Sequence, residues 1–418
     1  MLIEFRLRNY RCFKDEQVLS MVASSDSEHP ENVVDLGIPG VPKLLRSAVV
    51  YGANGSGKTT LLEALNFVHT FVSNMTMPGY KFYLPTFLFD EKTAKSPTDF
   101  EVIFVQDKVR YQYGFTADET RIYKEWLYAS PNGREAKLFV RQWAGDKKEY
   151  DYDWGDLLKG EKKRISNVRE NALFLTQAAF YNHPQLLNVY QWFSPGLEGW
   201  PTNEIPMDHI AEILQKPQNQ EQLVLMLKNA DMSIESFSLK QESASDNQDE
   251  RKIKRSAIFD EKKKITLTMR HKIDNGKTVD LNFLLDESKG TQRFFGIGAV
   301  ITEVLKERQV LYVDEIDSSL HPLLSRAIIQ LFHNPQENCR NVQLIFNTHD
   351  TTLLDPELFR RDQIWFTEKK KDGSAELYSL AEFSPRKGEA LAKNYLQGRY
   401  GAIPFVGNLA DEWSLKGC

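Results

Sequence analysis

The residues best suited to chemistry begin with a glycine-rich run, Gly52–Thr59, with the sequence GANGSGKT. The run matches GxxxxGK[ST], follows a short apolar stretch and precedes a stretch with helical spacing. Such glycines let backbone N–H groups converge on phosphates, and the helix that follows adds a positive dipole end. The alternative is a fortuitous glycine-rich turn. We expect a nucleotide triphosphate here, and the residues predicted to bind it are Gly52, Asn54, Gly55, Ser56, Gly57, Lys58, Thr59 and Thr60.

Within this run, two side chains have distinct expected roles. Lys58 is expected to reach the phosphates and to act in catalysis, and Thr59 to offer its hydroxyl to Mg2+. A second candidate set is the carboxylate pair Asp314 and Glu315, which ends the apolar stretch VLYV. Asp314 is expected to hold Mg2+ through its water shell, and Glu315 to act on the attacking water as general base or orienting group. The alternative is an acidic strand end at the surface.

His349 and a serine–glycine pair complete the candidate site. His349 follows the apolar stretch LIFNT, which places it at the same sheet edge as the carboxylates, where it is expected to sense the γ-phosphate. A hydrogen-bonded structural histidine is the alternative. Ser288 and Gly290 open a predicted helix and resemble the SxG signature of ABC ATPases, in which a hydroxyl, a backbone amide and a helix dipole hold a γ-phosphate. A plain helix N-cap by Ser288 is the alternative.

The elements that must position these residues alternate between strands and helices at both ends of the chain. Near the start we expect strands at 2–8 and 47–51 and a helix from residue 60. The later elements follow the same alternation, and the predicted set is a helix at 291–308, a strand at 310–315, a helix at 320–333 and a strand at 342–350. Because the last two strands are continuous apolar runs, we expect a parallel sheet covered by helices and built from both ends of the chain.

The middle of the sequence has a different pattern. Alternating stretches such as FEVIFV, separated by turn-rich segments, predict an antiparallel β lobe, and residues 153–231 favour helix before a polar run that predicts a mobile loop. The predicted fold class is α/β, with an antiparallel β lobe and a helical insert, and the resemblance of the motifs to those of ABC-type proteins implies a P-loop ATPase head of that type. The predicted division is a first core part at 1–79, the β lobe at 80–150, the helical insert and loop at 151–285, and a second core part with the tail at 286–418.

Composition excludes several classes of protein. The chain has 418 residues, 41% of them hydrophobic, and a net charge of −5, which indicates a folded protein without the overall positive charge of an indiscriminate nucleic-acid binder. Its 3 cysteines show no metal-binding spacing. We find no secretory leader and no apolar stretch of about 18 residues. A cytoplasmic protein without a membrane partner is therefore expected.

The combined motifs resemble a known family. GANGSGKTT, ESKGTQRF, LYVDEIDSSLHP and NTHD are similar to the motifs of ABC/SMC-type head ATPases, and within them to stand-alone bacterial defence ATPases of the RloA, AbiLi-like and PARIS types. The segments IEFRLRNYRCF and YLQGRYGAIPF also resemble that group. The resemblance implies ATP and Mg2+ as ligands, with ATP sandwiched in a homodimer or higher homo-oligomer between the phosphate loop of one subunit and Ser288 and Gly290 of the other. It also places Asp317–Leu320 at the partner-facing D-loop, and leaves Gln106, Gln112 and Gln177 as candidates for the glutamine loop.

The resemblance further implies a role in anti-phage defence. The 69 residues after His349 contain no DxD motif, so a TOPRIM-like or other nuclease effector is expected to act in trans. The tail segment Asn394–Phe405 is a candidate docking surface or a segment packed on its own sheet. The rival interpretation is a DNA-repair or chromosome-associated clamp. DNA contact would fall to the basic clusters Arg251–Arg255, Lys262–Lys264 and Lys369–Lys371, but solvated loop charge is the favoured explanation of these clusters because no aromatic residues are interleaved with them.

Overall fold

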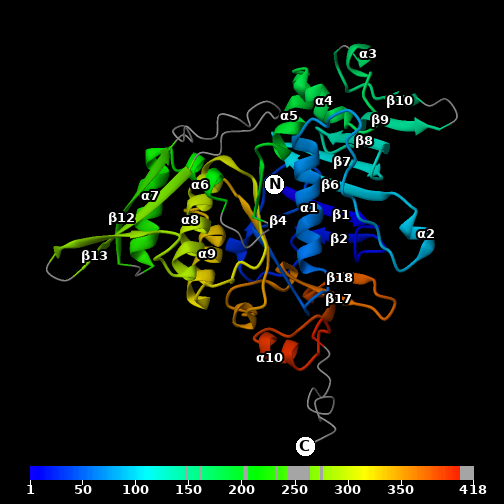
Figure 1. The fold of residues 1–418 in the computed structure, drawn as a ribbon. Coiled ribbons are helices and arrows are strands. Elements are labelled where there is room, and N and C mark those ends of the chain that lie inside the picture. Colours follow the sequence, from blue (N-terminus) through cyan, green and yellow to red (C-terminus); the bar gives the residue numbers. More distant parts are fainter. Residues whose placement is uncertain are drawn as a thin grey trace, which may run out of the picture. The chain divides into compact units, whose positions relative to one another are not determined.

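The computed structural model describes residues 1–145, 149–160, 162–200, 206–230, 233–242, 264–273 and 276–404. The chain forms two compact units, which are considered separately here (Figure 1). Unit 1 comprises residues 1–201, 307–317 and 325–418, and unit 2 comprises residues 202–306 and 318–324.

A six-stranded sheet in unit 1 carries most of the predicted motifs. Its order is β11-β15-β16-β5-β17-β18, with the bounds β5 Ser47–Gly52, β11 Leu197–Trp200, β15 Val310–Val313, β16 Gln343–Asn347, β17 Ile364–Lys369 and β18 Ala375–Ser379. The first five strands in this order are parallel, and β18 is antiparallel to β17. Every residue of β5, β15 and β16 is buried, as continuous apolar runs predict. The predicted parallel sheet built from both ends of the chain is thus confirmed.

A second sheet in unit 1 is entirely antiparallel. Its order is β10-β9-β8-β7-β6-β1-β2, with the bounds β1 Leu2–Arg8, β2 Gln17–Ser20, β6 Thr98–Gln106, β7 Val109–Ala117, β8 Ile122–Ser130, β9 Ala136–Ala144 and β10 Glu149–Trp154. The predicted β lobe is present, and the predicted antiparallel strand at 2–8 joins it between β6 and β2. A short pair, β3 Val33–Val34 and β4 Leu44–Leu45, lies outside both sheets.

Helix α1 (Lys58–Ser73) joins the core of both sheets. Its buried face supplies Leu61, Leu65 and Val68 to one hydrophobic cluster that also contains residues of β5, β16, β1 and β6. Phe67 of α1 contacts Phe100 of β6 with ring centroids 5.4 Å apart. Because the helix is packed on both sides, its N-terminus, where the glycine-rich loop ends, is held rigidly.

Shorter helices complete unit 1. Their bounds are α2 Glu91–Ala94, α3 Lys162–Ile165, α4 Phe174–Phe180, α5 Pro184–Phe193 and α10 Leu391–Leu396, and α9 Pro322–His333 begins in unit 2 and ends in unit 1. Single 3-10 turns occur at Pro30–Asn32, Thr351–Leu353, Arg361–Gln363 and Leu380–Phe383. Across the described residues, no helix combines the length and apolarity needed to cross a membrane.

Unit 2 consists of helices and a small sheet. Its helices are α6 Met207–Ile213, α7 Pro217–Asn229 and most of α8 Lys289–Glu307 (Figure 1). The antiparallel sheet has the order β12-β13-β14, with the bounds Ile234–Glu242, Lys264–Lys272 and Thr278–Asn282. Phe295 of α8 contacts the rings of Phe237 and Phe283, so the sheet and the helix share a core.

The region predicted as a helical insert, 151–285, is only partly helical, and this corrects the prediction. Besides α3 to α7 it contains β11 and the three strands of the unit 2 sheet. β11 is only four residues long and gains its pairing from β15, more than 100 positions later. Apolar and polar residues alternate along β12 and β13, as is typical of strands, but the polar run between the two segments weakened that signal. The rest of this run, including Arg251–Arg255, Lys262 and Lys263, lies outside the described residues.

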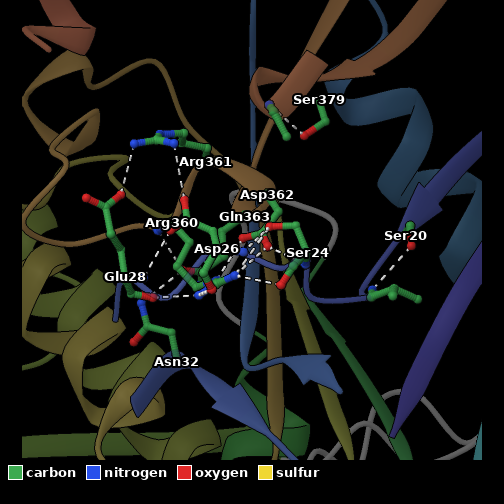
Figure 2. Close-up of polar contacts among 12 residues, drawn as sticks. Ser20, Ser24, Asp26, Glu28, Asn32, Arg360, Arg361, Asp362, Gln363 and Ser379 are labelled. Carbon is green, nitrogen blue, oxygen red and sulfur yellow. Dashed lines mark hydrogen bonds and ion pairs between the residues drawn. The ribbon is translucent and has the colours of Figure 1, made fainter. Parts of the chain in front are cut away.

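A buried polar cluster anchors the starts of β5 and β17 (Figure 2). The Arg360 guanidinium, 1% exposed, donates to both carboxylate oxygens of Asp362, at 2.9 and 2.8 Å, and to the carbonyl oxygens of Asp26 and Glu28. Gln363, which follows Asp362, donates from its side-chain amide to the Ser47 hydroxyl at 2.8 Å. The cluster therefore fixes the near ends of two parallel strands whose far ends carry the candidate site.

Candidate nucleotide-binding site

The glycine-rich loop requires glycine at two points. A Cβ on Gly52 would lie 2.4 Å from the Thr367 carbonyl oxygen on the neighbouring strand β17. Gly57 has φ +119°, and its Cβ would meet the Phe13 ring at 3.0 Å and the Cys12 thiol at 3.1 Å. At these two positions a side chain is therefore excluded by close packing and by backbone conformation, as the sequence predicts for a loop that approaches phosphates.

Lys58 is buried at the start of α1 and folds back on the loop. Its Nζ donates to the carbonyl oxygens of Gly52, at 2.9 Å, and Ala53, at 3.0 Å. Burial lowers the pKa of Lys58 to about 8, although the carboxylates of Asp314 and Glu315 oppose this shift. The ammonium group is thus held at the loop by two carbonyl oxygens in a buried position, which is suited to receive the negative charge of a phosphate.

Thr59 and Asp314 lie together at the end of β15. The Thr59 hydroxyl is 3.1 and 3.3 Å from the two carboxylate oxygens of Asp314. Burial raises the pKa of Asp314, while hydrogen bonds from Asn347 and Thr59 act in the opposite direction. A hydroxyl and a carboxylate in contact are oxygen ligands of the kind that Mg2+ prefers, so this pair fits that ion.

Most of the predicted phosphate-loop residues, with Glu315 and His349, line one cavity of about 880 Å3. Its lining includes Asn54, Gly55, Gly57, Lys58, Thr59 and Thr60. Ser56 is instead buried, with its hydroxyl 2.7 Å from that of Thr367. His349 is exposed at the rim, and partial burial together with the nearby Lys58 charge lowers its pKa, which favours the neutral imidazole. The volume is within the range of small-molecule sites.

Several cavity residues were not predicted from the sequence. Arg11 and Lys369 add positive charge to the lining, and Leu88 and Phe89 add exposed apolar surface. Arg11 also forms an ion pair with Glu63 of α1 at 3.3 Å. Arg11 precedes the phosphate loop, Leu88 and Phe89 lie between that loop and Asp314, and Lys369 follows His349, so only the tertiary fold brings these residues to the cavity. Lys369 was considered in the sequence only as part of a basic cluster.

Ser288 and Gly290 belong to unit 2 and stand at the start of α8. The Ser288 hydroxyl accepts the N–H of Thr291 at 3.0 Å, which is the N-cap arrangement. The buried Gln292 amide donates to the carbonyl oxygens of Phe283, Leu284 and Glu287, so the segment that precedes the helix is held firmly. Ser288 itself is exposed. The γ-phosphate role of this segment stays a prediction.

The remaining candidates lie away from the cavity. Gln106, Gln112 and Gln177 are not among its lining residues, and each contacts another part of unit 1. In the tail, Tyr395 and Tyr400 are buried and their rings stack on Phe366 of β17, so the described residues 394–404 pack on their own sheet; Phe405 lies outside the described residues.

The sequence matches a known protein family over residues 47–355, described as "AAA domain, putative AbiEii toxin, Type IV TA system". This match covers well over half of the chain and contains every site residue predicted from the sequence. None of the curated proteins compared with the sequence matches it.

SMC heads are among the solved structures to which this chain is similar. The SMC head domain from Thermotoga maritima is 11% identical, with 90% of this chain and 98% of that chain covered and a TM-score of 0.40. The SmcHead bound to the C-winged helix domain of ScpA is 12% identical, covering 90% and 97%, with a TM-score of 0.41. The Smc head domain with an extended coiled coil, bound to the C-terminal domain of ScpA and derived from Pyrococcus furiosus, is 11% identical, covering 96% and 99%, with a TM-score of 0.40.

The fold class predicted from the sequence is confirmed. A parallel sheet, a glycine-rich loop between β5 and α1, and an antiparallel sheet packed on the same helix form an ABC-type P-loop ATPase head.

Proposed function

Because this chain belongs to that family of AAA ATPase domains, we propose that it binds and hydrolyses ATP with Mg2+ and dimerises through the bound nucleotide. The observation that carries the proposal is the convergence of Lys58, Thr59, Glu315 and His349 on one cavity, with Asp314 in contact with Thr59. A lysine, a hydroxyl, two carboxylates and an imidazole at a strand–loop–helix junction are the groups that phosphoryl transfer uses.

Each residue has a role in this proposal. The loop amides and Lys58 bind the phosphates, and Thr59 and Asp314 hold Mg2+, which neutralises phosphate charge when bound. Glu315 orients the attacking water and accepts its proton, since its side chain lines the cavity beside Lys58 and His349. The neutral imidazole of His349 then donates a hydrogen bond to the γ-phosphate.

Dimerisation would complete the site. Ser288 and Gly290 of a second subunit are proposed to contact the γ-phosphate, because Ser288 is exposed at the start of a long helix whose dipole favours an anion. ATP would then act as the joint between two copies, and its hydrolysis would separate them. Higher homo-oligomers would form by further contacts between such dimers.

The cellular role that we propose is regulation in anti-phage defence, with a nuclease effector acting in trans. The family description names a toxin, and the motifs resemble those of defence ATPases. Co-purification of a nuclease-like protein in the absence of DNA would support this role. A DNA-binding clamp would instead show a steep, linear loss of DNA affinity as the logarithm of salt concentration rises.

The biochemical proposal is tested with Glu315→Gln. This variant keeps phosphate and Mg2+ ligands but cannot deprotonate water, so we expect it to bind ATP and accumulate as a dimer, with hydrolysis reduced about 100-fold or more. Size-exclusion chromatography with light scattering measures the dimer. Lys58→Ala is the matched control, which should lose ATP affinity and stay monomeric. Full turnover by Glu315→Gln would contradict the role of Glu315, and a strictly monomeric ATP complex would contradict dimerisation.

A further inference from the structure

Asn347 lies between the two carboxylate residues and touches both. It is the last residue of β16, directly beside the end of β15, and its side chain is fully buried. Its Oδ1 accepts the backbone N–H of Glu315 at 2.6 Å, and its Nδ2 donates to the Asp314 carboxylate. One side chain thus contacts the proposed Mg2+ ligand and the main chain of the proposed general base.

The Glu315 backbone needs such support. Glu315 has φ +47°, in the left-handed region that residues other than glycine seldom occupy. In this conformation the chain leaves the strand sharply after Asp314, and the Glu315 N–H points at Asn347 instead of continuing the ladder between strands. The Asn347 carbonyl oxygen also accepts the N–H of Ile316, at 3.3 Å. The turn that aims Glu315 at the cavity therefore rests on Asn347.

The chemistry of the amide fixes its orientation. A backbone N–H requires an acceptor and a carboxylate requires a donor, so the two contacts are satisfied only with Oδ1 toward Glu315 and Nδ2 toward Asp314. An aspartate of the same shape would keep the first contact and oppose the second, because a carboxylate oxygen would then face the Asp314 carboxylate. The two contacts can accordingly be separated by substitution.

We propose that Asn347 is a positioning residue that sets Glu315 for attack on water and Asp314 for Mg2+. The inference rests on the proposed ATPase function. Asn347 lies behind the carboxylates and is absent from the cavity lining, so it acts through its neighbours and does not touch the nucleotide. Residues that orient ligands in this way typically change activity 10- to 100-fold when removed.

A double-mutant cycle tests the contact with Glu315. We expect Asn347→Ala to reduce kcat about 10- to 100-fold with ATP affinity little changed, because the phosphate loop is untouched. In the Glu315→Gln background, at a Mg2+ concentration that saturates both proteins, the same substitution should cause no further loss in single-turnover ATP hydrolysis, since the general base that Asn347 positions is already disabled. An equal loss in both backgrounds, or unchanged kcat in Asn347→Ala, would overturn the inference.

Asn347→Asp tests the contact with Asp314. We expect the Mg2+ concentration for half-maximal activity to rise at least 10-fold, and a wild-type Mg2+ dependence would contradict this part.

Asn338→Ala is the matched control, because Asn338 is also fully buried and bonds the Phe332 and Val342 backbones, yet contacts no candidate site residue. It should lower thermal stability while kcat and the Mg2+ dependence stay unchanged. Full activity in Glu315→Gln would refute the proposed general base itself. This result differs from an equal loss caused by Asn347→Ala in both backgrounds, which would refute only the positioning role of Asn347.

Discussion

At the scale of single residues, the candidate site contains buried charged groups that lower the stability of the fold. The Lys58 ammonium is 5% exposed, and its partners within hydrogen-bond distance are the two loop carbonyls, not an anion. Asp314 is likewise buried, and its pKa is raised by that burial. Such burial favours the neutral forms of both groups, so a bound phosphate and cation would relieve an unfavourable arrangement.

This argument predicts a pH-dependent gain in stability for Lys58→Met in the absence of nucleotide. The pKa of Lys58 is about 8 in the folded protein and ordinarily 10.5, so between these values the unfolded chain holds more protons and wild-type stability rises with pH. The variant lacks this dependence. Its advantage should therefore be largest below pH 8 and shrink by up to about 3 kcal/mol toward pH 10.5.

Urea unfolding of both proteins at several pH values between 7 and 10.5 measures this difference. Other titrating groups cancel in the comparison because they are shared. A constant difference across the range would contradict the buried ammonium. Loss of the two hydrogen bonds from Lys58 shifts the whole curve but not its dependence on pH.

The sequence predicts the site residues that belong to local motifs and misses those that only the fold assembles. Lys58 and Thr59 are recognisable because the loop chemistry needs them at fixed spacing. Asn347 directly follows the apolar residues 344–346, a signal that a buried partner was required, but the identity of that partner depends on the pairing of β15 with β16. Arg11 carries no comparable signal, since it reaches the cavity through the turn after β1.

At the scale of elements, two properties decide whether the sequence predicts a strand. These are how clear its hydrophobic pattern is and how far along the chain its pairing partner lies. Strands β5, β15 and β16 are fully buried, have apolar central residues and are flanked by strong turn or helix signals, so their prediction is confirmed. β11 has the sequence LEGW, which carries no alternation long enough to detect. Its Gly199 also packs against the Tyr312 ring, where a Cβ would come within 2.1 Å, so its place in the sheet depends on a residue far along the chain.

The cluster in Figure 2 makes a prediction at this scale, because it fixes the starts of β5 and β17. Arg360→Met leaves the Asp362 carboxylate buried without its cation, and we expect a loss of about 3–5 kcal/mol in the free energy of unfolding. Arg361→Met is the control. Arg361 forms ion pairs with Asp26 and Glu28 but is partly exposed, so its loss should cost about 1 kcal/mol or less.

Chemical unfolding monitored by circular dichroism compares the two variants. The double variant Arg360→Met with Asp362→Asn should recover part of the loss, since the uncompensated charge is then gone. Similar small losses in both single variants would show that the buried pair does not anchor the strands.

At the scale of the whole molecule, the predicted γ-phosphate residues and the phosphate loop belong to different compact units. Lys58 and Asp314 lie in unit 1, and Ser288 and Gly290 lie in unit 2. A site that uses both sets can therefore be completed in two ways, within one chain or between two copies. The proposed dimer requires the second way, and the two cases differ in how inactive variants behave when mixed.

We predict that Lys58→Ala and Ser288→Arg complement each other. Lys58→Ala disables the phosphate loop, and Ser288→Arg blocks the opposing helix start by bulk, so each homodimer contains only defective sites. In a mixed dimer, the intact loop of the Ser288→Arg subunit faces the intact Ser288 of the Lys58→Ala subunit, which restores one of its two sites. Each mixed dimer holds one complete site of two, and Lys58→Ala is not expected to pair with itself, so ATP hydrolysis in an equimolar mixture should reach at most about half of the wild-type rate if the sites act independently. Steady-state hydrolysis across mixing ratios should peak near equal amounts, whereas a site completed within one chain would give no activity at any ratio.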